Sequence, residues 1–145
     1  MQALCSKREY CRYDAMSKAL KLLEGDRAKA LEIVEALIEE KYVDDLRYAS
    51  AFAREKSSIS GWGRVKIAYA LSLKGMDRGL VSLAMEEIET DAAERKMNSV
   101  IKTKYKTLSK DPQCRLKLIR FALSRGYEYD TAVELIDSVI KSSSE

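Results

Sequence analysis

The sequence predicts an all-α protein built from three tandem three-helix units, which together form an elongated, curved helical-repeat body. Three observations support this fold class. Of the 145 residues, 46% are hydrophobic and 34% are charged, with one proline and six glycines, a balance typical of a helix-rich globular protein. Segments of similar pattern recur about fifty residues apart. Within each segment the apolar residues follow the period of an amphipathic helix.

The repeat is clearest between the second and third units. Residues 64–67 (RVKI) recur as residues 115–118 (RLKL), fifty-one positions later, and Gly75 recurs as Gly126 at the same spacing. After a glycine in each unit, apolar residues at i, i+1, i+4 and i+8 line one helical face. These sets are Ala30, Leu31, Val34 and Ile38; Leu80, Val81, Ala84 and Ile88; and Ala132, Val133, Ile136 and Ile140.

Each unit is expected to hold a leading helix, a basic middle helix that ends at glycine, and a third amphipathic helix. The predicted units are residues 1–42, 43–90 and 91–141, followed by a frayed tail at 142–145. Three short helices bury little apolar surface alone, so neighbouring units are expected to share contacts.

The leading helices are predicted within residues 2–10, over 44–56 and over 92–108. Asp44 and Asp45 suit a helix N-terminus, where free N–H groups favour carboxylates. Pro112 is expected in the first turn of the next helix, with Asp111 as its cap.

Composition excludes several classes of function. The chain has no histidine, which removes Ser-His-Asp and Cys-His catalysis and most zinc sites. Its three cysteines, Cys5, Cys11 and Cys114, have no CxxC spacing. No apolar run approaches the roughly 20 residues of a membrane span, and the N-terminus lacks the apolar core of a signal peptide. We therefore predict a cytoplasmic protein that is not an enzyme and needs no cofactor or metal. We also expect it to be a monomer.

The stretch Gly61, Trp62, Gly63 invites comparison with a nucleotide-binding loop. The third glycine of a dinucleotide fingerprint is missing, no strand precedes the stretch, and no Gly-Lys-Ser or Gly-Lys-Thr occurs. The glycines are better interpreted as the entry to a helix that ends at Gly75.

Basic residues gather in the last third of the chain. Residues 92–145 hold eleven basic and seven acidic side chains, a net charge of +4, while the rest of the chain totals −1. A concentration of this kind favours polyanions, of which nucleic acid is the commonest. The alternative is that these cations are only the solvated faces of their helices. The candidate binding residues are Arg64, Lys66, Lys74, Lys102, Lys104, Lys106, Arg115, Lys117, Arg120 and Arg125.

Three stretches of the sequence resemble the RecX family. Residues 41–52 (KYVDDLRYASAF), 62–67 (WGRVKI) and 74–76 (KGM) are similar to its core signature, an aromatic-x-Asp-Asp-x-Arg-aromatic-Ala box followed by a basic helix ending in Lys-Gly-hydrophobic. Residues 118–127 are similar to its C-terminal repeat. The chain departs from the family pattern around residues 11–16 and at Lys41, which stands where a glycine usually precedes the aromatic residue.

The resemblance implies a non-enzymatic regulator of the RecA recombinase, built from tandem three-helix units. Such a protein would bind RecA or its filament on single-stranded DNA and inhibit or modulate its ATPase, strand-exchange and coprotease activities in homologous recombination, DNA repair and the SOS response. The basic residues also make single-stranded or double-stranded DNA a candidate partner. The alternatives are a DNA-binding helical protein that acts independently of RecA, and a helical-repeat adaptor without a nucleic-acid role.

Overall fold

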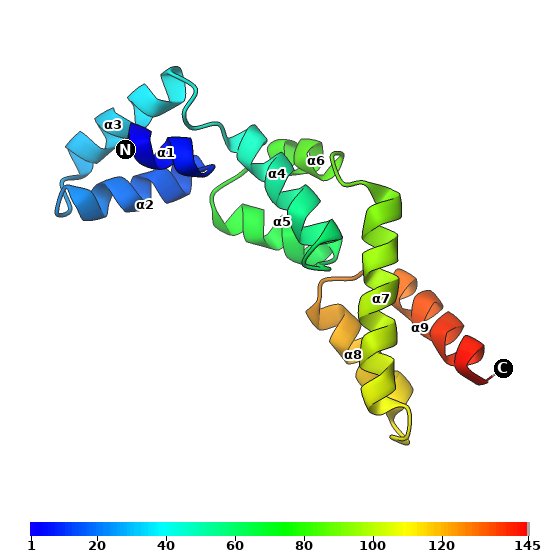
Figure 1. The fold of residues 1–145 in the computed structure, drawn as a ribbon. Coiled ribbons are helices and arrows are strands. Elements are labelled where there is room, and N and C mark those ends of the chain that lie inside the picture. Colours follow the sequence, from blue (N-terminus) through cyan, green and yellow to red (C-terminus); the bar gives the residue numbers. More distant parts are fainter. Residues whose placement is uncertain (145) are drawn as a thin grey trace. The chain divides into compact units, whose positions relative to one another are not determined.

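The computed structural model describes residues 1–144, and every regular element in them is an α-helix (Figure 1). This confirms the all-α fold class. The helices are α1 (Gln2–Lys7), α2 (Arg12–Leu22), α3 (Arg27–Glu39), α4 (Asp45–Ser58), α5 (Arg64–Leu73), α6 (Arg78–Met85), α7 (Thr90–Leu108), α8 (Cys114–Ser124) and α9 (Tyr129–Ser144). None of the helices described is both long and apolar enough to cross a membrane.

By its internal contacts the chain divides into two compact units. Unit 1 comprises Met1–Ala51 and Leu71–Glu86, and unit 2 comprises Phe52–Ala70 and the residues from Glu87 onward. The predicted division at residues 42 and 90 stays a prediction, because parts of the middle segment belong to each of the two compact units. Of the predicted tail, residues 142–144 belong to α9, and residue 145 lies outside the described residues.

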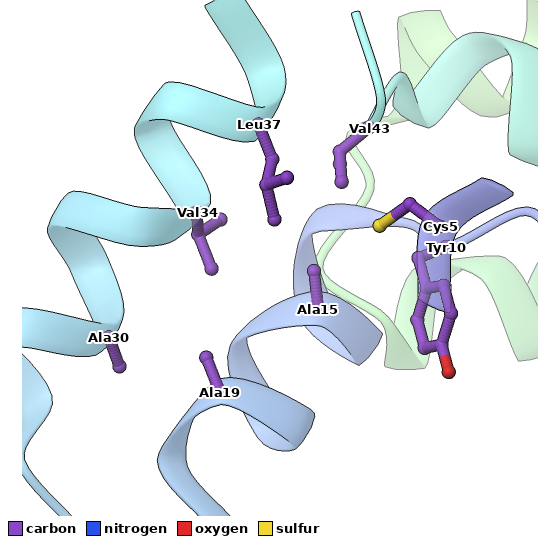
Figure 2. Close-up of a cluster of buried hydrophobic side chains, with 8 residues drawn as sticks. All are labelled: Cys5, Tyr10, Ala15, Ala19, Ala30, Val34, Leu37 and Val43. Atoms are coloured by element: carbon purple, nitrogen blue, oxygen red, sulfur yellow. The ribbon is translucent and has the colours of Figure 1, made fainter. Parts of the chain in front are cut away.

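The core of unit 1 lies between α1, α2 and α3 (Figure 2). Ala15 and Ala19 of α2 belong to the same cluster as Ala30 of α3, with Ala19 the nearer of the two to Ala30, and these small side chains let the two helices approach closely. Val34 and Leu37 complete the α3 side of the cluster. Of the face predicted for this helix, Ala30, Val34 and Ile38 pack in the core, whereas Leu31 is 39% exposed and Leu37 is buried in its place.

The end of α3 carries a strained residue. Lys41 has a φ of 64°, in the left-handed region that glycine adopts most cheaply. Backbone N–H groups of Lys41 and Tyr42 donate to Ile38 and Leu37, which closes the helix in this conformation. Lys41 thus stands at a position that needs a positive φ and where the family pattern has glycine. We expect this to lower the free energy of unfolding by about 1 kcal/mol.

The core of unit 2 is formed by α7, α8 and α9. Each helix contributes one fully buried side chain to a shared cluster: Ile101 from α7, Leu118 from α8 and Ile136 from α9. Ala122 and Ala132 are also fully buried there. This shared cluster fixes the orientation of the basic helices α7 and α8 within the unit.

Two predicted helix starts have different outcomes. Asp44 caps α4, because its carboxylate accepts the Arg47 N–H at 3.0 Å. The prediction for Pro112 was wrong: α8 begins at Cys114, two residues after the proline. Asp111 accepts the Gln113 N–H at 2.8 Å and so stabilises a turn that precedes the helix.

Candidate functional site

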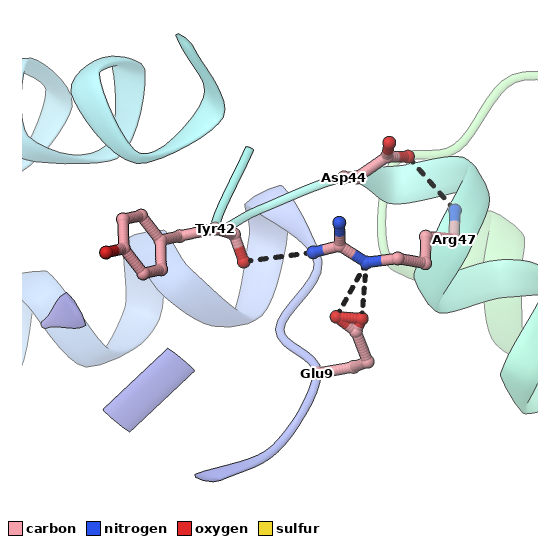
Figure 3. A network of polar contacts seen from close by, with 4 residues as sticks. All are labelled: Glu9, Tyr42, Asp44 and Arg47. Atoms are coloured by element: carbon pink, nitrogen blue, oxygen red, sulfur yellow. Dashed lines mark hydrogen bonds and ion pairs between the residues drawn. The ribbon is translucent and has the colours of Figure 1, made fainter. Parts of the chain in front are cut away.

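The Asp-Asp-x-Arg box, residues 44–47, connects two segments of unit 1 (Figure 3). The Arg47 guanidinium donates through Nε to both carboxylate oxygens of Glu9, at 2.8 and 2.6 Å, and through Nη2 to the Tyr42 carbonyl at 3.3 Å. The hydrogen bond to Glu9 raises the pKa of Arg47 further above its usual value. Asp45 accepts the Arg12 N–H at 2.7 Å. The box therefore ties the segment before α2 to the α3–α4 connection.

Lys74 has an internal partner in unit 1. Its ammonium lies 2.7 Å from both carboxylate oxygens of Asp14 and 5.3 Å from the centre of the Tyr48 ring. The side chains of Lys74 and Asp14 are only 25% and 17% exposed. Burial lowers the pKa of Lys74, but hydrogen bonds to Asp14 and Tyr48 outweigh it and leave the pKa above its usual 10.5. Lys74 thus belongs to unit 1, whereas the other nine candidates belong to unit 2.

Lys74→Met is expected to lower the free energy of unfolding by about 1–3 kcal/mol, because it leaves the Asp14 carboxylate partly buried without its cation. The raised folded-state pKa means that the contribution of Lys74 is complete below pH 10.5 and is lost as the pH rises through the folded value. Urea unfolding at pH 7 and pH 11 should show the difference between wild type and variant shrinking at the higher pH. Lys21→Met, at an exposed position of α2, is the matched control and should change little.

Three of the candidate cations on α7 and α8 are exposed and have no ionic partner in the described part of the chain. Lys102 and Lys106 are one helical turn apart on α7, and Arg120 lies on α8. Lys104 instead lies over the Phe121 ring, 5.2 Å from its centre. These three free charges are the part of the α7–α8 candidates that is most available to an outside anion.

Two other α8 cations are paired. Arg115 donates to Asp137 of α9 at 2.8 Å, and Lys117 forms an ion pair with Asp111. The hydrogen bonds from Arg115 and Lys117 lower the pKa values of Asp137 and Asp111 respectively. All four side chains are at least a quarter exposed, so these pairs exchange readily with competing ions.

Arg125 connects the turn before α9 to the loop before α5. Its Nη2 donates to the Ser60 carbonyl, and its guanidinium lies 6.0 Å from the centre of the Phe121 ring. Its Nε is buried without a partner in the described residues. The Arg125 side chain therefore serves mainly to connect two segments of unit 2.

The Gly61, Trp62, Gly63 stretch docks on the same turn. The Gly63 N–H donates to the Arg125 carbonyl at 2.7 Å, and the Tyr127 hydroxyl donates to the Gly61 carbonyl at 2.5 Å. Burial raises the pKa of Tyr127, which keeps the hydroxyl protonated as a donor. The stretch is thus a docking loop of unit 2, in agreement with its interpretation as a helix entry and not as a nucleotide loop.

Trp62 lines a cavity and lies beside two lysines. The cavity measures about 220 Å³ and is lined by Trp62, Arg64, Met97 and Tyr127, among others. Lys66 lies 4.2 Å and Lys56 4.9 Å from the centre of the Trp62 ring. Sequence reasoning missed Lys56, although its spacing of four from Phe52 on a helix is a signal for cation and ring to meet.

Comparison with known proteins identifies the family. Residues 44–85 match the family model described as RecX, second three-helix domain. The regulatory protein RecX of Pseudomonas putida (strain GB-1) is 30% identical over 134 residues, which cover 92% of this chain and 84% of that protein. The chain belongs to the RecX family. The regulatory protein RecX of Clostridium tetani is 25% identical over 126 residues, and the match covers 57% of its length, so the chain spans little more than half of this relative.

Solved structures of RecX proteins share the fold. A crystal structure of regulatory protein RecX superposes with a TM-score of 0.80 at 17% identity, covering 94% of this chain and 67% of that one. The crystal structure of RecX from Lactobacillus salivarius gives a TM-score of 0.74 at 23% identity, covering 97% and 89%. At these identities the likeness establishes the RecX fold alone.

Proposed function

We propose that this RecX-family chain binds RecA or its filament on single-stranded DNA and inhibits the ATPase, strand-exchange and coprotease activities of RecA. The observation that carries the proposal is the set of unpaired, exposed cations on α7 and α8 of unit 2, Lys102, Lys106 and Arg120. Membership of a family of regulatory proteins supports a role that acts through binding. The chain would act as a monomer, in the cytoplasm, with its helices grouped in three units.

The physical basis is electrostatic. Free cations on neighbouring helices raise the local potential and attract phosphates or acidic protein surface, and each neutralised phosphate releases counterions. The paired residues Arg115 and Lys117 contribute less, because a new partner must first displace Asp137 or Asp111. Lys74 contributes least, because Asp14 already neutralises it in a partly buried pair.

The triple variant K102E/K106E/R120E is expected to raise the concentration needed for half-inhibition of RecA by about tenfold or more, since it reverses three contacts that accumulate along a polyanion. The measurement is a titration into RecA hydrolysing ATP on single-stranded DNA. Inhibition at substoichiometric amounts would indicate capping of the filament, and a one-to-one requirement would indicate coating of its groove.

The matched control reverses three exposed cations of unit 1, in the variant K7E/K21E/R27E. It changes the net charge by the same amount and should leave inhibition within about twofold of wild type, because the altered charges lie outside the proposed surface. Equal losses in both triple variants would reject the assignment of the surface to α7 and α8. Absence of any inhibition by the wild-type chain would reject the proposed function.

A further inference from the structure

One ring in unit 2 holds two ammonium groups. Lys56 of α4 and Lys66 of α5 lie 4.9 and 4.2 Å from the centre of the Trp62 ring, and Lys56 also lies 5.6 Å from the Phe52 ring. Phe52 meets Trp62 edge to face, with ring centres 5.9 Å apart. Both lysines thus lie against the Trp62 ring, one from the segment before the docking loop and one from the segment after it.

Neither lysine is neutralised within the part of the chain that the structure describes. The ion pairs found there engage other cations, and Glu94 and Glu128, which line the cavity beside Trp62, pair with neither Lys56 nor Lys66. The ring faces attract both ammonium groups but carry only a partial negative charge. A bound anion would supply the full negative charge that the rings lack.

The backbone around the pair is fixed before any ligand arrives. The Val65 N–H donates to the Gly126 carbonyl at 3.1 Å, and Gly126 lies so close to Lys66 that a Cβ there would meet the Lys66 Cβ at 2.2 Å. Both lysine side chains are half-buried, which limits their rotamer freedom. A site with ordered cations loses little entropy when an anion binds.

We propose that Lys56, Trp62 and Lys66 form a phosphate clamp for the backbone of single-stranded nucleic acid. The choice of nucleic acid rests on the function proposed above, and the clamp adds a second contact region, on α4 and α5, to the α7–α8 surface. Alternation of aromatic and basic residues favours a single strand over an acidic protein: Arg64 is exposed beside Trp62, and Tyr69, 64% exposed, follows on α5. Bases stack on such rings while phosphates meet the cations.

The test measures binding of a fluorescently labelled single-stranded oligonucleotide by anisotropy, without RecA, over a range of salt concentrations. K56Q and K66Q should each reduce the slope of log affinity against log salt by about 0.7, and the double variant by about 1.4, as expected for one phosphate contact per lysine. At low salt the double variant should bind at least about tenfold more weakly. K110Q, at an exposed lysine in the loop before α8, is the matched control and should keep the wild-type slope.

A charge-preserving variant separates binding from folding. K56R/K66R keeps both cations over the ring and should bind within about twofold of wild type. Far-UV circular dichroism checks that each variant is folded, and the fluorescence of Trp62, the chain's single tryptophan, should respond to the oligonucleotide in the wild type and the arginine variant only. A slope for K56Q/K66Q equal to that of K110Q would overturn the clamp.

The remaining outcomes separate the clamp from the proposed function. If the wild type binds no oligonucleotide but K56Q/K66Q loses inhibition of RecA, the clamp takes an acidic protein surface and the nucleic-acid proposal is overturned. If the slopes change as expected while the wild type leaves RecA activity unaltered, the clamp stands and the proposed function fails.

Discussion

Gly63→Ala is expected to lower the free energy of unfolding of unit 2 by about 3 kcal/mol or more. A Cβ at Gly63 would lie 2.3 Å from the carbonyl carbon and oxygen of Gly126 and 2.4 Å from the nitrogen of Tyr127. These are backbone atoms, so no change of side-chain rotamer relieves the overlap. The docking loop would have to leave the turn before α9 and give up the hydrogen bonds that Gly63 and Gly61 make there.

Urea unfolding followed by Trp62 fluorescence measures this effect, because the tryptophan adjoins the substituted residue. Gly75→Ala is the informative control. Gly75 has a φ of 77°, but a Cβ there would meet nothing within 4 Å, so only backbone strain of about 1 kcal/mol is expected. Similar costs for the two variants would show that conformation, and not close packing, explains both glycines.

The glycines show which features of the fold the sequence can predict and which it cannot. Gly75 and Gly126 have positive φ values of 77° and 88° directly after their helices, as the glycine-terminated repeat predicts. The cap at Asp44 is equally local and was also predicted correctly. The contact of Gly63 with Gly126 joins residues far apart in sequence, and the helical period carries no information about such pairing.

The candidate site shows the same limit. Charge density along the chain identified the basic segments, but it gave equal weight to cations in different situations. Lys74 meets Asp14, sixty residues away, and Arg115 meets Asp137 on the next helix, whereas Lys102 meets no carboxylate in the described residues. Only packing decides which cations are already neutralised, because ion pairing depends on the distance between side chains. The sequence alone therefore predicted a basic region, but not which of its cations already have an internal ionic partner.

The second large effect on stability is expected at Leu118, which ends the RLKL run that repeats RVKI. The last residue of each run, Ile67 or Leu118, is fully buried, whereas Val65 and Leu116, two positions earlier, are 56% and 45% exposed. On a helix, positions two apart point about 200° apart, so the same run supplies one core residue and one surface residue. The repeat thus conserves a pattern of burial as well as a sequence.

Leu118→Ala is expected to cost about 2–5 kcal/mol, because it leaves a cavity among Ile101 and Ile136 in the core of unit 2. Leu116→Ala removes the same atoms from a half-exposed site and should cost about 0.5 kcal/mol or less. Thermal and urea unfolding of the two variants, with the same chemical change two residues apart, measures the difference directly. If Leu116→Ala proved as costly as Leu118→Ala, α8 would have to be rotated from the orientation described, and Arg120 would no longer face an outside anion. The stability of this pair therefore tests the orientation on which the proposed α7–α8 surface depends.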